Sequence, residues 1–218
     1  MGSSIIPNSI CLAGPDGAGK TTQADRLAKH LEALGRATRM CTIWDMLDQA
    51  AAGSLPFRSK SEIDSFLGSV HANARAMFLH MAMREALDRA LDDRGDRTLI
   101  VVGYWPKYNA SERIYGADTG LLDALGTSFP ELDLLLYLDL DPATALRRKE
   151  TISGYESAGK GRDGFLPFQA KAQAAMAELR TRFGGERWQL VDGRADADTV
   201  SQEVTARVDA WRLGTAPV

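Results

Sequence analysis

The sequence predicts an α/β protein of three layers, in which a five-stranded parallel sheet is flanked by helices on both faces. Three observations predict this class. Short, continuous apolar runs recur along the 218 residues, as is typical of strands covered on both faces. Helical patterns separate these runs, which favours parallel strands joined by helices. A glycine-rich loop directly follows the first run and precedes a helical pattern.

The predicted elements alternate along the chain. Strands are predicted, in order, at 9–13, 38–43, 98–103, 134–140 and, more weakly, 188–193. Helices are predicted over 20–34 (ended by Gly35), 62–93, a short stretch opened by Pro142, 167–183 and 196–212. The stretch 151–164 is glycine-rich, polar and basic. It predicts a mobile lid at about 150–165 within a single domain that spans 1–218, rather than a linker between two domains.

Composition limits the partners. The chain has 26 Lys and Arg against 29 Asp and Glu, a formal charge of -3, so neither a nucleic acid nor an anionic membrane is expected as a main partner. No apolar run reaches the roughly 20 residues of a membrane span, and the start of the chain does not resemble a signal peptide. Cys11 and Cys41 lie in predicted strands and are expected to be reduced core residues of a cytoplasmic protein. A disulfide between them is the alternative.

The loop after the first strand carries a phosphate-binding motif. The stretch GPDGAGKT fits G-x-x-x-x-G-K-[ST] at every fixed position, with a predicted strand before it and an amphipathic helix after it. Its glycines let successive backbone N–H groups point at an anion, and the helix N-terminus adds a positive end. The residues predicted to contact phosphate are Gly14, Asp16, Gly17, Ala18, Gly19, Lys20, Thr21 and Thr22. A chance glycine turn before a helix is the alternative.

Two side chains of this P-loop have predicted roles. Lys20 can reach the β- and γ-phosphates of a nucleoside triphosphate, and the Thr21 hydroxyl can complete the shell of a Mg²⁺ ion. ATP and Mg²⁺ are therefore the expected co-substrate and cofactor. The loop alone does not separate kinases from ATPases or GTPases, but the N-K-x-D guanine motif of switch GTPases is absent from the sequence.

Three stretches resemble the thymidylate kinase (dTMP kinase) family, or a close relative among the nucleoside monophosphate kinases. GPDGAGKTTQADRLAKHLEALG is similar to the family's opening, FPELDLLLYLDLDPATALRR resembles its fourth strand, and WQLVDGRADADTVSQEVTARV resembles its fifth strand and adenine-side loop. The resemblance extends from about residue 9 to residue 212. It implies transfer of the γ-phosphoryl group of Mg·ATP to a small acceptor, a nucleoside monophosphate with dTMP as first choice, and a homodimer formed through helices.

The acceptor motif departs from the family. Its pattern there is D-R-[YH]-x-x-S-x-x-A-Y-Q, and PKYNASERIYG keeps Tyr108, Ser111 and Tyr115 at that spacing. Pro106 replaces the aspartate and cannot do its work near the magnesium. Lys107 replaces the arginine that grips the acceptor phosphate, and the resemblance implies that it meets the phosphate as a point charge rather than a planar fork. Ordinary core packing is the alternative for the two tyrosines.

A second departure follows the second predicted strand, where TIWDML stands in place of an R-E-P-G loop. The acceptor side is thus altered twice, while the donor side is intact. By resemblance, Asp16 can reach the acceptor's sugar hydroxyl. Arg75, on the long predicted helix, is a candidate to read a pyrimidine edge, as are His80 and Arg84, although the alignment fixes no position there. His80 is more simply explained as a satisfied helix histidine.

The remaining predicted catalytic groups are cations near the lid. The P-loop here has no arginine, and in that form of the family the lid supplies the cation for the transition state. Arg162 and Lys160 lie in the lid, and Arg148 lies on the predicted helix before it. A cation on the equatorial oxygens accelerates phosphoryl transfer, and lid closure would exclude water. A solvated loop is the alternative for these charges.

Two other functions stay open at this point. Pro106 and Trp44-Asp45 favour a specialised kinase whose acceptor is a modified nucleotide, a nucleoside or a non-nucleotide metabolite. Pro106 would also suit a regulatory nucleotide-binding protein without transferase activity, whereas the intact Lys20-Thr21 pair and the basic lid speak against it.

Overall fold

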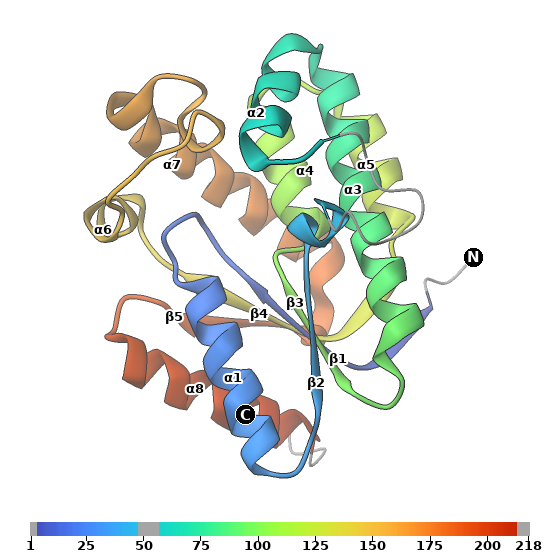
Figure 1. Ribbon diagram of the computed structural model, residues 1–218. Helices are drawn as coiled ribbons and strands as arrows, with labels where there is room; N and C mark the ends of the chain where they lie inside the picture. Colours follow the sequence, from blue (N-terminus) through green and yellow to red (C-terminus); the bar gives the residue numbers. More distant parts are fainter. Residues whose placement is uncertain (1–3, 48–56, 213–218) are drawn as a thin grey trace.

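A computed structural model describes residues 4–47 and 57–212 (Figure 1). Its sheet has five parallel strands in the order β2-β3-β1-β4-β5. The strands are β1 (Ile5–Ala13), β2 (Thr38–Thr42), β3 (Thr98–Val102), β4 (Glu131–Asp139) and β5 (Trp188–Asp192). All five occur where the sequence predicts strands, and the predicted fold class is confirmed.

The helices follow the strands in alternation. They are α1 (Lys20–Ala33), α2 (Lys60–Ser69), α3 (Ala72–Arg94), α4 (Trp105–Ile114), α5 (Thr119–Thr127), α6 (Pro142–Arg148), α7 (Gly161–Leu179) and α8 (Ala197–Arg212). Short turns of other helix types are η1 (Ile43–Leu47), η2 (Tyr155–Ser157), η3 (Arg180–Gly184) and η4 (Gly185–Arg187). The sequence did not predict α4 and α5.

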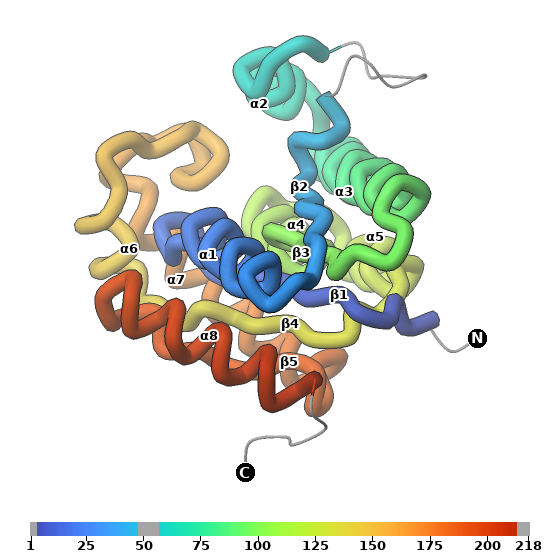
Figure 2. The backbone as a smooth tube through the Cα atoms, turned by 60° about the horizontal axis from the view of Figure 1, so that its bottom comes forward, coloured from blue at the N-terminus to red at the C-terminus, as the bar shows by residue number. Residues whose placement is uncertain are grey.

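Alternate residues of the strands face two separate cores. On β1, Cys11 packs with α3 and α4, whereas Leu12 packs with α1 and α8. Figure 2 shows α1 and α8 together on one side of the sheet and α3, α4, α5 and α7 on the other. Both cores are fully buried, which explains why the central strands are apolar without alternation. Cys11 and Cys41 are both buried and unbridged in this structure, and Val101 of β3 lies between them in the sheet.

The central strand β1 starts earlier than predicted. Ile5 and Ile6 pair with the first residues of β4, and the register then shifts before Ile10. Pro7 and Asn8 occupy this irregular point, where Asn8 has a positive φ of 56°. Proline lacks the N–H that pairs neighbouring strands, but it is tolerated at a bulge. Because Pro7 and Asn8 interrupt the apolar run, the sequence analysis did not predict the first residues of β1.

The long helix predicted over 62–93 is two helices. Val70 and His71 are extended, with ψ of 156° and 158°, and they separate α2 from α3. The Ser59 hydroxyl caps the start of α2 by accepting from the Glu62 N–H at 3.2 Å. At its other end, the Leu67 carbonyl accepts a hydrogen bond from the Arg75 guanidinium at 2.7 Å. A side chain of α3 thus satisfies a carbonyl that continued helix would have used.

The predicted lid contains structure of its own. Helix α7 begins at Gly161, six residues before the predicted start at 167, and Pro167 lies inside it. The stretch before it folds into η2. No helix in the described ranges combines the length and apolar composition that crossing a membrane requires.

Candidate active site

The loop between β1 and α1 has a backbone that only glycine adopts easily. Gly14, Gly17 and Gly19 have φ of 146°, 93° and 83°. A Cβ on Gly14 would lie 2.8 Å from the Leu138 carbonyl oxygen, and one on Gly17 would lie 2.9 Å from the Ala145 carbonyl oxygen. Both are rigid backbone atoms, so side chains at these two positions would displace the loop from β4 and α6.

Lys20 is the first residue of α1 and folds back over the loop. Its ammonium donates to the carbonyl oxygens of Gly14 at 3.0 Å and Pro15 at 2.8 Å. It also lies 3.6 Å from an Asp16 carboxylate oxygen. Burial, together with the nearby charge of Lys107, lowers the pKa of Lys20 to about 8.

Asp16 lies between two lysines. Its Oδ1 accepts from Lys107 Nζ at 2.8 Å, while Lys20 approaches the same oxygen. Burial alone would raise the pKa of this carboxyl, but the charges of Lys107 and Lys20 hold it well below its usual range. Burial likewise opposes the charge on Lys107, yet Asp16 raises the pKa of that ammonium above its ordinary value. The trio is therefore a charged group of one anion and two cations.

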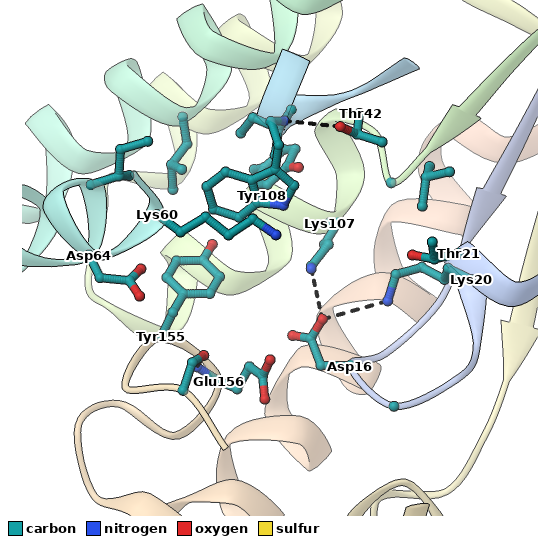
Figure 3. Close-up of a pocket in the computed structure, with 18 of the residues that line it drawn as sticks. Asp16, Lys20, Thr21, Thr42, Lys60, Asp64, Lys107, Tyr108, Tyr155 and Glu156 are labelled. Atoms are coloured by element: carbon teal, nitrogen blue, oxygen red, sulfur yellow. Dashed lines mark hydrogen bonds and ion pairs between the residues drawn. The ribbon is translucent and has the colours of Figure 1, made fainter. Parts of the chain in front are cut away.

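These side chains lie in one pocket with a volume of about 510 Å³ (Figure 3). The P-loop and the start of α1 form one wall, and β2, η1 and α2 form another. Residues from α4 and from the stretch before α7 close the remaining sides. The polar residues that line it are Asp16, Lys20, Thr21, Thr22, Thr42, Lys60, Asp64, Lys107, Tyr108, Ser153, Tyr155 and Glu156.

The acceptor motif opens helix α4 but contributes unequally to this pocket. Lys107 and Tyr108 line it. Ser111 is buried behind the P-loop, beside a cavity of only about 20 Å³. Tyr115, at the end of the helix, donates its hydroxyl to the Tyr155 carbonyl oxygen at 2.8 Å and so ties α4 to the predicted lid. Pro106 occupies the first turn of α4, where proline is well tolerated.

Arg75 lies outside the set of residues that line the pocket, because a buried carboxylate holds it. Glu112 of α4 accepts from Arg75 Nε at 3.0 Å and from its Nη2 at 3.3 Å. The guanidinium also lies 3.8 Å from the ring centroid of Tyr115. The structure thus commits the predicted base-reading arginine to an ion pair. Glu112 lies four residues after Tyr108 and three before Tyr115, and so on the same face of a helix. A carboxylate on such an apolar face needs a buried partner, and this was the signal in the sequence that could have predicted the ion pair.

Arg148 also lies away from the pocket lining. It donates to the carbonyl oxygens of Gly193 at 2.7 Å, Arg194 at 2.9 Å and Ala195 at 2.9 Å. The arginine therefore joins the end of α6 to the loop after β5. Acting on a phosphate would require it to leave all three carbonyls.

Among the lid residues, Lys160 and Arg162 are exposed at the start of α7. The residues that reach the pocket from this region are instead Ser153, Tyr155 and Glu156. Glu156 pairs with Lys149 at 2.6 Å. Of the remaining candidates, His80 is buried and only half satisfied: its Nδ1 is hydrogen-bonded to the Ala76 carbonyl oxygen at 2.8 Å, whereas its buried Nε2 has no hydrogen-bond partner among the described residues.

The donor side fits a magnesium ion that arrives with a nucleotide. Thr21, in the first turn of α1, lines the pocket beside Lys20. Within residues 4–47 and 57–212, no cluster of three or more acidic, histidine or cysteine side chains could hold a metal by itself. Mg²⁺ keeps several waters and commonly binds one or two protein oxygens plus substrate phosphates. The Thr21 hydroxyl is such an oxygen.

The parallel sheet and the P-loop that joins its central strand to α1 define the class: the chain is a P-loop phosphotransferase, a kinase. Comparison with curated proteins gives the family. A thymidylate kinase of Xanthomonas oryzae pv. oryzae (strain PXO99A) is 30% identical over 207 residues, which cover 92% of this chain and 82% of that protein. A thymidylate kinase of Jannaschia sp. (strain CCS1) is 30% identical over 219 residues, covering 91% and 94%. The chain belongs to the thymidylate kinase family.

A third relative agrees with this assignment. The thymidylate kinase of Ruegeria pomeroyi (strain ATCC 700808 / DSM 15171 / DSS-3) is 27% identical over 206 residues, covering 90% of this chain and 92% of the relative. No family model matches the chain.

Proposed function

We propose that the protein transfers the γ-phosphoryl group of Mg·ATP to a nucleoside monophosphate, with dTMP as first choice. The observation that carries the proposal is the Lys20–Asp16–Lys107 trio, which spans the P-loop and the acceptor motif inside one pocket. The names of the relatives supply the nucleotide class and dTMP itself.

On the donor side, the P-loop residues Gly14 to Thr22 hold the triphosphate through backbone N–H groups. Lys20 leaves the loop carbonyls and moves onto the β- and γ-phosphates, where charge-assisted bonds are stronger than its present ones. Thr21 holds the Mg²⁺ ion, which neutralises charge on the phosphates when bound.

On the acceptor side, Lys107 holds the acceptor phosphate close to the γ-phosphorus. A phosphate oxygen of the acceptor attacks that phosphorus, the bond to the β–γ bridging oxygen breaks, and ADP leaves with that electron pair. Asp16 orients Lys107 and is placed to accept from a sugar hydroxyl of the acceptor. Tyr108 lines the acceptor part, whereas Ser111 and Tyr115 support it from behind.

The lid supplies a cation for the transferring phosphoryl group. Arg162 is exposed on the first turn of α7, and movement of the 150–165 stretch over the donor would bring it onto the transferring phosphoryl group. Arg148 is the weaker candidate, since its guanidinium is used by three carbonyls. The catalysis is therefore mainly positioning and charge neutralisation.

A specialised kinase for a modified nucleotide, a nucleoside or a non-nucleotide metabolite is the second candidate. The ion pair of Arg75 with Glu112 favours it, because three of the five N–H donors of this nearly buried guanidinium already bond Glu112 and the Leu67 carbonyl, which limits what it can offer to a pyrimidine edge. Pro106 and Trp44 favour it as well, since the acceptor side lacks the family's residues there.

The test is ADP release with Mg·ATP against dTMP, dUMP, 5-substituted dUMPs, CMP, AMP, GMP and thymidine, with a control that lacks acceptor. Turnover on dTMP near a typical 1–10³ s⁻¹ supports the first proposal. Turnover on another member of the panel alone supports the specialised kinase. Binding of ATP without turnover on any member of the panel contradicts the first proposal and leaves a non-nucleotide acceptor or the regulatory alternative.

We also propose a cytoplasmic homodimer. Met77 and Met81 are exposed one turn apart on α3, with exposed fractions of 55% and 47%, and offer an apolar face for a second copy. Light scattering coupled to size exclusion gives the mass directly, and a monomer at micromolar concentration would contradict the dimer.

A further inference from the structure

The wall of the pocket opposite the P-loop carries a lysine for which the sequence analysis predicted no role. Lys60 is the first residue of α2, and its side chain lines the pocket together with Trp44 of η1. The Lys60 ammonium lies 4.5 Å from the centroid of the Trp44 ring. Figure 3 shows the Lys60 side chain extended into the cavity beside Tyr108, on the side away from Lys20.

The three lysines that line the pocket differ in their partners. Lys107 and Lys20 both approach Asp16, at 2.8 Å and 3.6 Å. Among the described residues, Lys60 has no carboxylate within ion-pair distance, and the contact of its ammonium is the Trp44 ring. Asp64, one turn further along α2, lines the same wall without pairing with it.

The positive charge of Lys20 and Lys107 is not enough to neutralise both a donor triphosphate and an acceptor phosphate. Asp16 already offsets one of the two positive charges beside it, and Lys20 serves the donor triphosphate. Lys107 would then face a doubly negative acceptor phosphate as a single, already paired ammonium. The attraction between a cation and an aromatic face is weak at an exposed site, and a hydrogen bond from an ammonium to an anion is stronger. Lys60 can therefore leave the ring for a phosphate.

We propose that Lys60 is the second acceptor-binding cation, and that it holds the acceptor's phosphate from the side opposite Lys107. Trp44 keeps the ammonium inside the pocket until the acceptor arrives. The assignment rests on the proposed function, because it presumes an acceptor that carries a phosphate. The assignment also gives a physical role to the TIWDML stretch, which stands in place of the family's R-E-P-G loop. Its tryptophan, Trp44, would hold the lysine that takes over the missing arginine's charge.

The test compares Lys60→Met with Lys60→Arg and with Lys171→Met. Lys171 is exposed on α7 and outside the pocket lining, so its variant controls for the loss of one positive charge. Calorimetric titration with dTMP in the absence of ATP gives the acceptor Kd without turnover. The acceptor KM and the ATP KM follow from ADP release. If the wild-type protein phosphorylates a different nucleotide of the panel, that nucleotide replaces dTMP.

We expect Lys60→Met to raise the acceptor Kd and KM about tenfold or more, the scale of one charge-assisted bond. The ATP KM should stay within about twofold, Lys60→Arg should restore most of the acceptor affinity, and Lys171→Met should match the wild type. Equal acceptor Kd for Lys60→Met and wild type overturns the assignment, as does an equal rise in the ATP KM. If the wild-type protein binds and phosphorylates no nucleotide, the proposed function itself fails, which is a different result.

Discussion

Replacing Glu112 by Gln tests the buried ion pair between α3 and α4. Glu112 is fully buried and Arg75 is 8% exposed, so the substitution leaves a guanidinium charge in the core without its counter-charge. Removing one partner of a buried pair typically costs about 3–5 kcal/mol. We expect a loss of about 3 kcal/mol here, because the amide oxygen still accepts one bond and the Leu67 carbonyl still holds Arg75.

The assay is urea unfolding of the wild type, Glu112→Gln, Arg75→Met and the double variant. The free energies of a coupled pair are not additive, so the double variant should be more stable than the sum of the single losses predicts, by about 1 kcal/mol or more. A loss of 3 kcal/mol corresponds to roughly 6–12 °C in Tm for a chain of this size. Asp88→Asn is the matched control, because Asp88 and Arg84 form a half-exposed pair on α3 and should contribute under about 0.5 kcal/mol.

A loss below about 1 kcal/mol for Glu112→Gln, or strict additivity in the double variant, would refute the reasoning. The first result would mean that Arg75 does not depend on Glu112 in the folded protein. The second would mean that the two side chains do not interact in solution.

Three further predictions concern the pocket. Lys20→Ala should abolish transfer to every acceptor, as measured by ADP release, and full activity would contradict the donor site. Lys107→Ala should raise the acceptor KM far more than the ATP KM, whereas a rise in the ATP KM alone would show that the acceptor motif is misassigned. Since the pKa of Lys20 is about 8 in the folded protein and 10.5 in the reference state, raising the pH from 7 to 9 should weaken ATP binding. The folded chain binds fewer protons than the unfolded chain between these two values, so the same group makes stability rise with pH from about 8 to 10.5. Calorimetry of ATP binding across that range checks the first sign, and an affinity that does not change contradicts it.

Local patterns were sufficient to predict the sheet and the P-loop. A strand buried on both faces is apolar throughout. The positive φ of Gly14, Gly17 and Gly19 favours glycine, so the conformation of the loop is evident from the spacing of glycines in the sequence. The division between α2 and α3 was harder to predict, because the helical pattern runs through Val70 and His71. The break is stabilised by the bond from Arg75 to Leu67, a tertiary contact that no local periodicity records.

The candidate site shows the same limit. Lys107 was expected from the spacing of the acceptor motif, whereas Lys60 reaches the pocket only because the tertiary fold brings α2 and the end of β2 to the same cavity. Glu112 was available as a signal, since it shares a helix face with Tyr108, but its partner lies 37 residues away. Which cations reach the pocket therefore depends on contacts distant in sequence.

The retracted position of Lys20 has a consequence for ligand choice. Its ammonium already has two carbonyl acceptors, so an incoming ligand must replace existing bonds rather than fill an empty position. A neutral or weakly charged ligand cannot offer a better exchange, while a triphosphate can. We therefore expect the Kd to fall along the series adenosine, AMP, ADP and ATP, with the largest decreases at ADP and ATP. The P-loop would then select ligands by their negative charge, independently of contacts to the base or sugar.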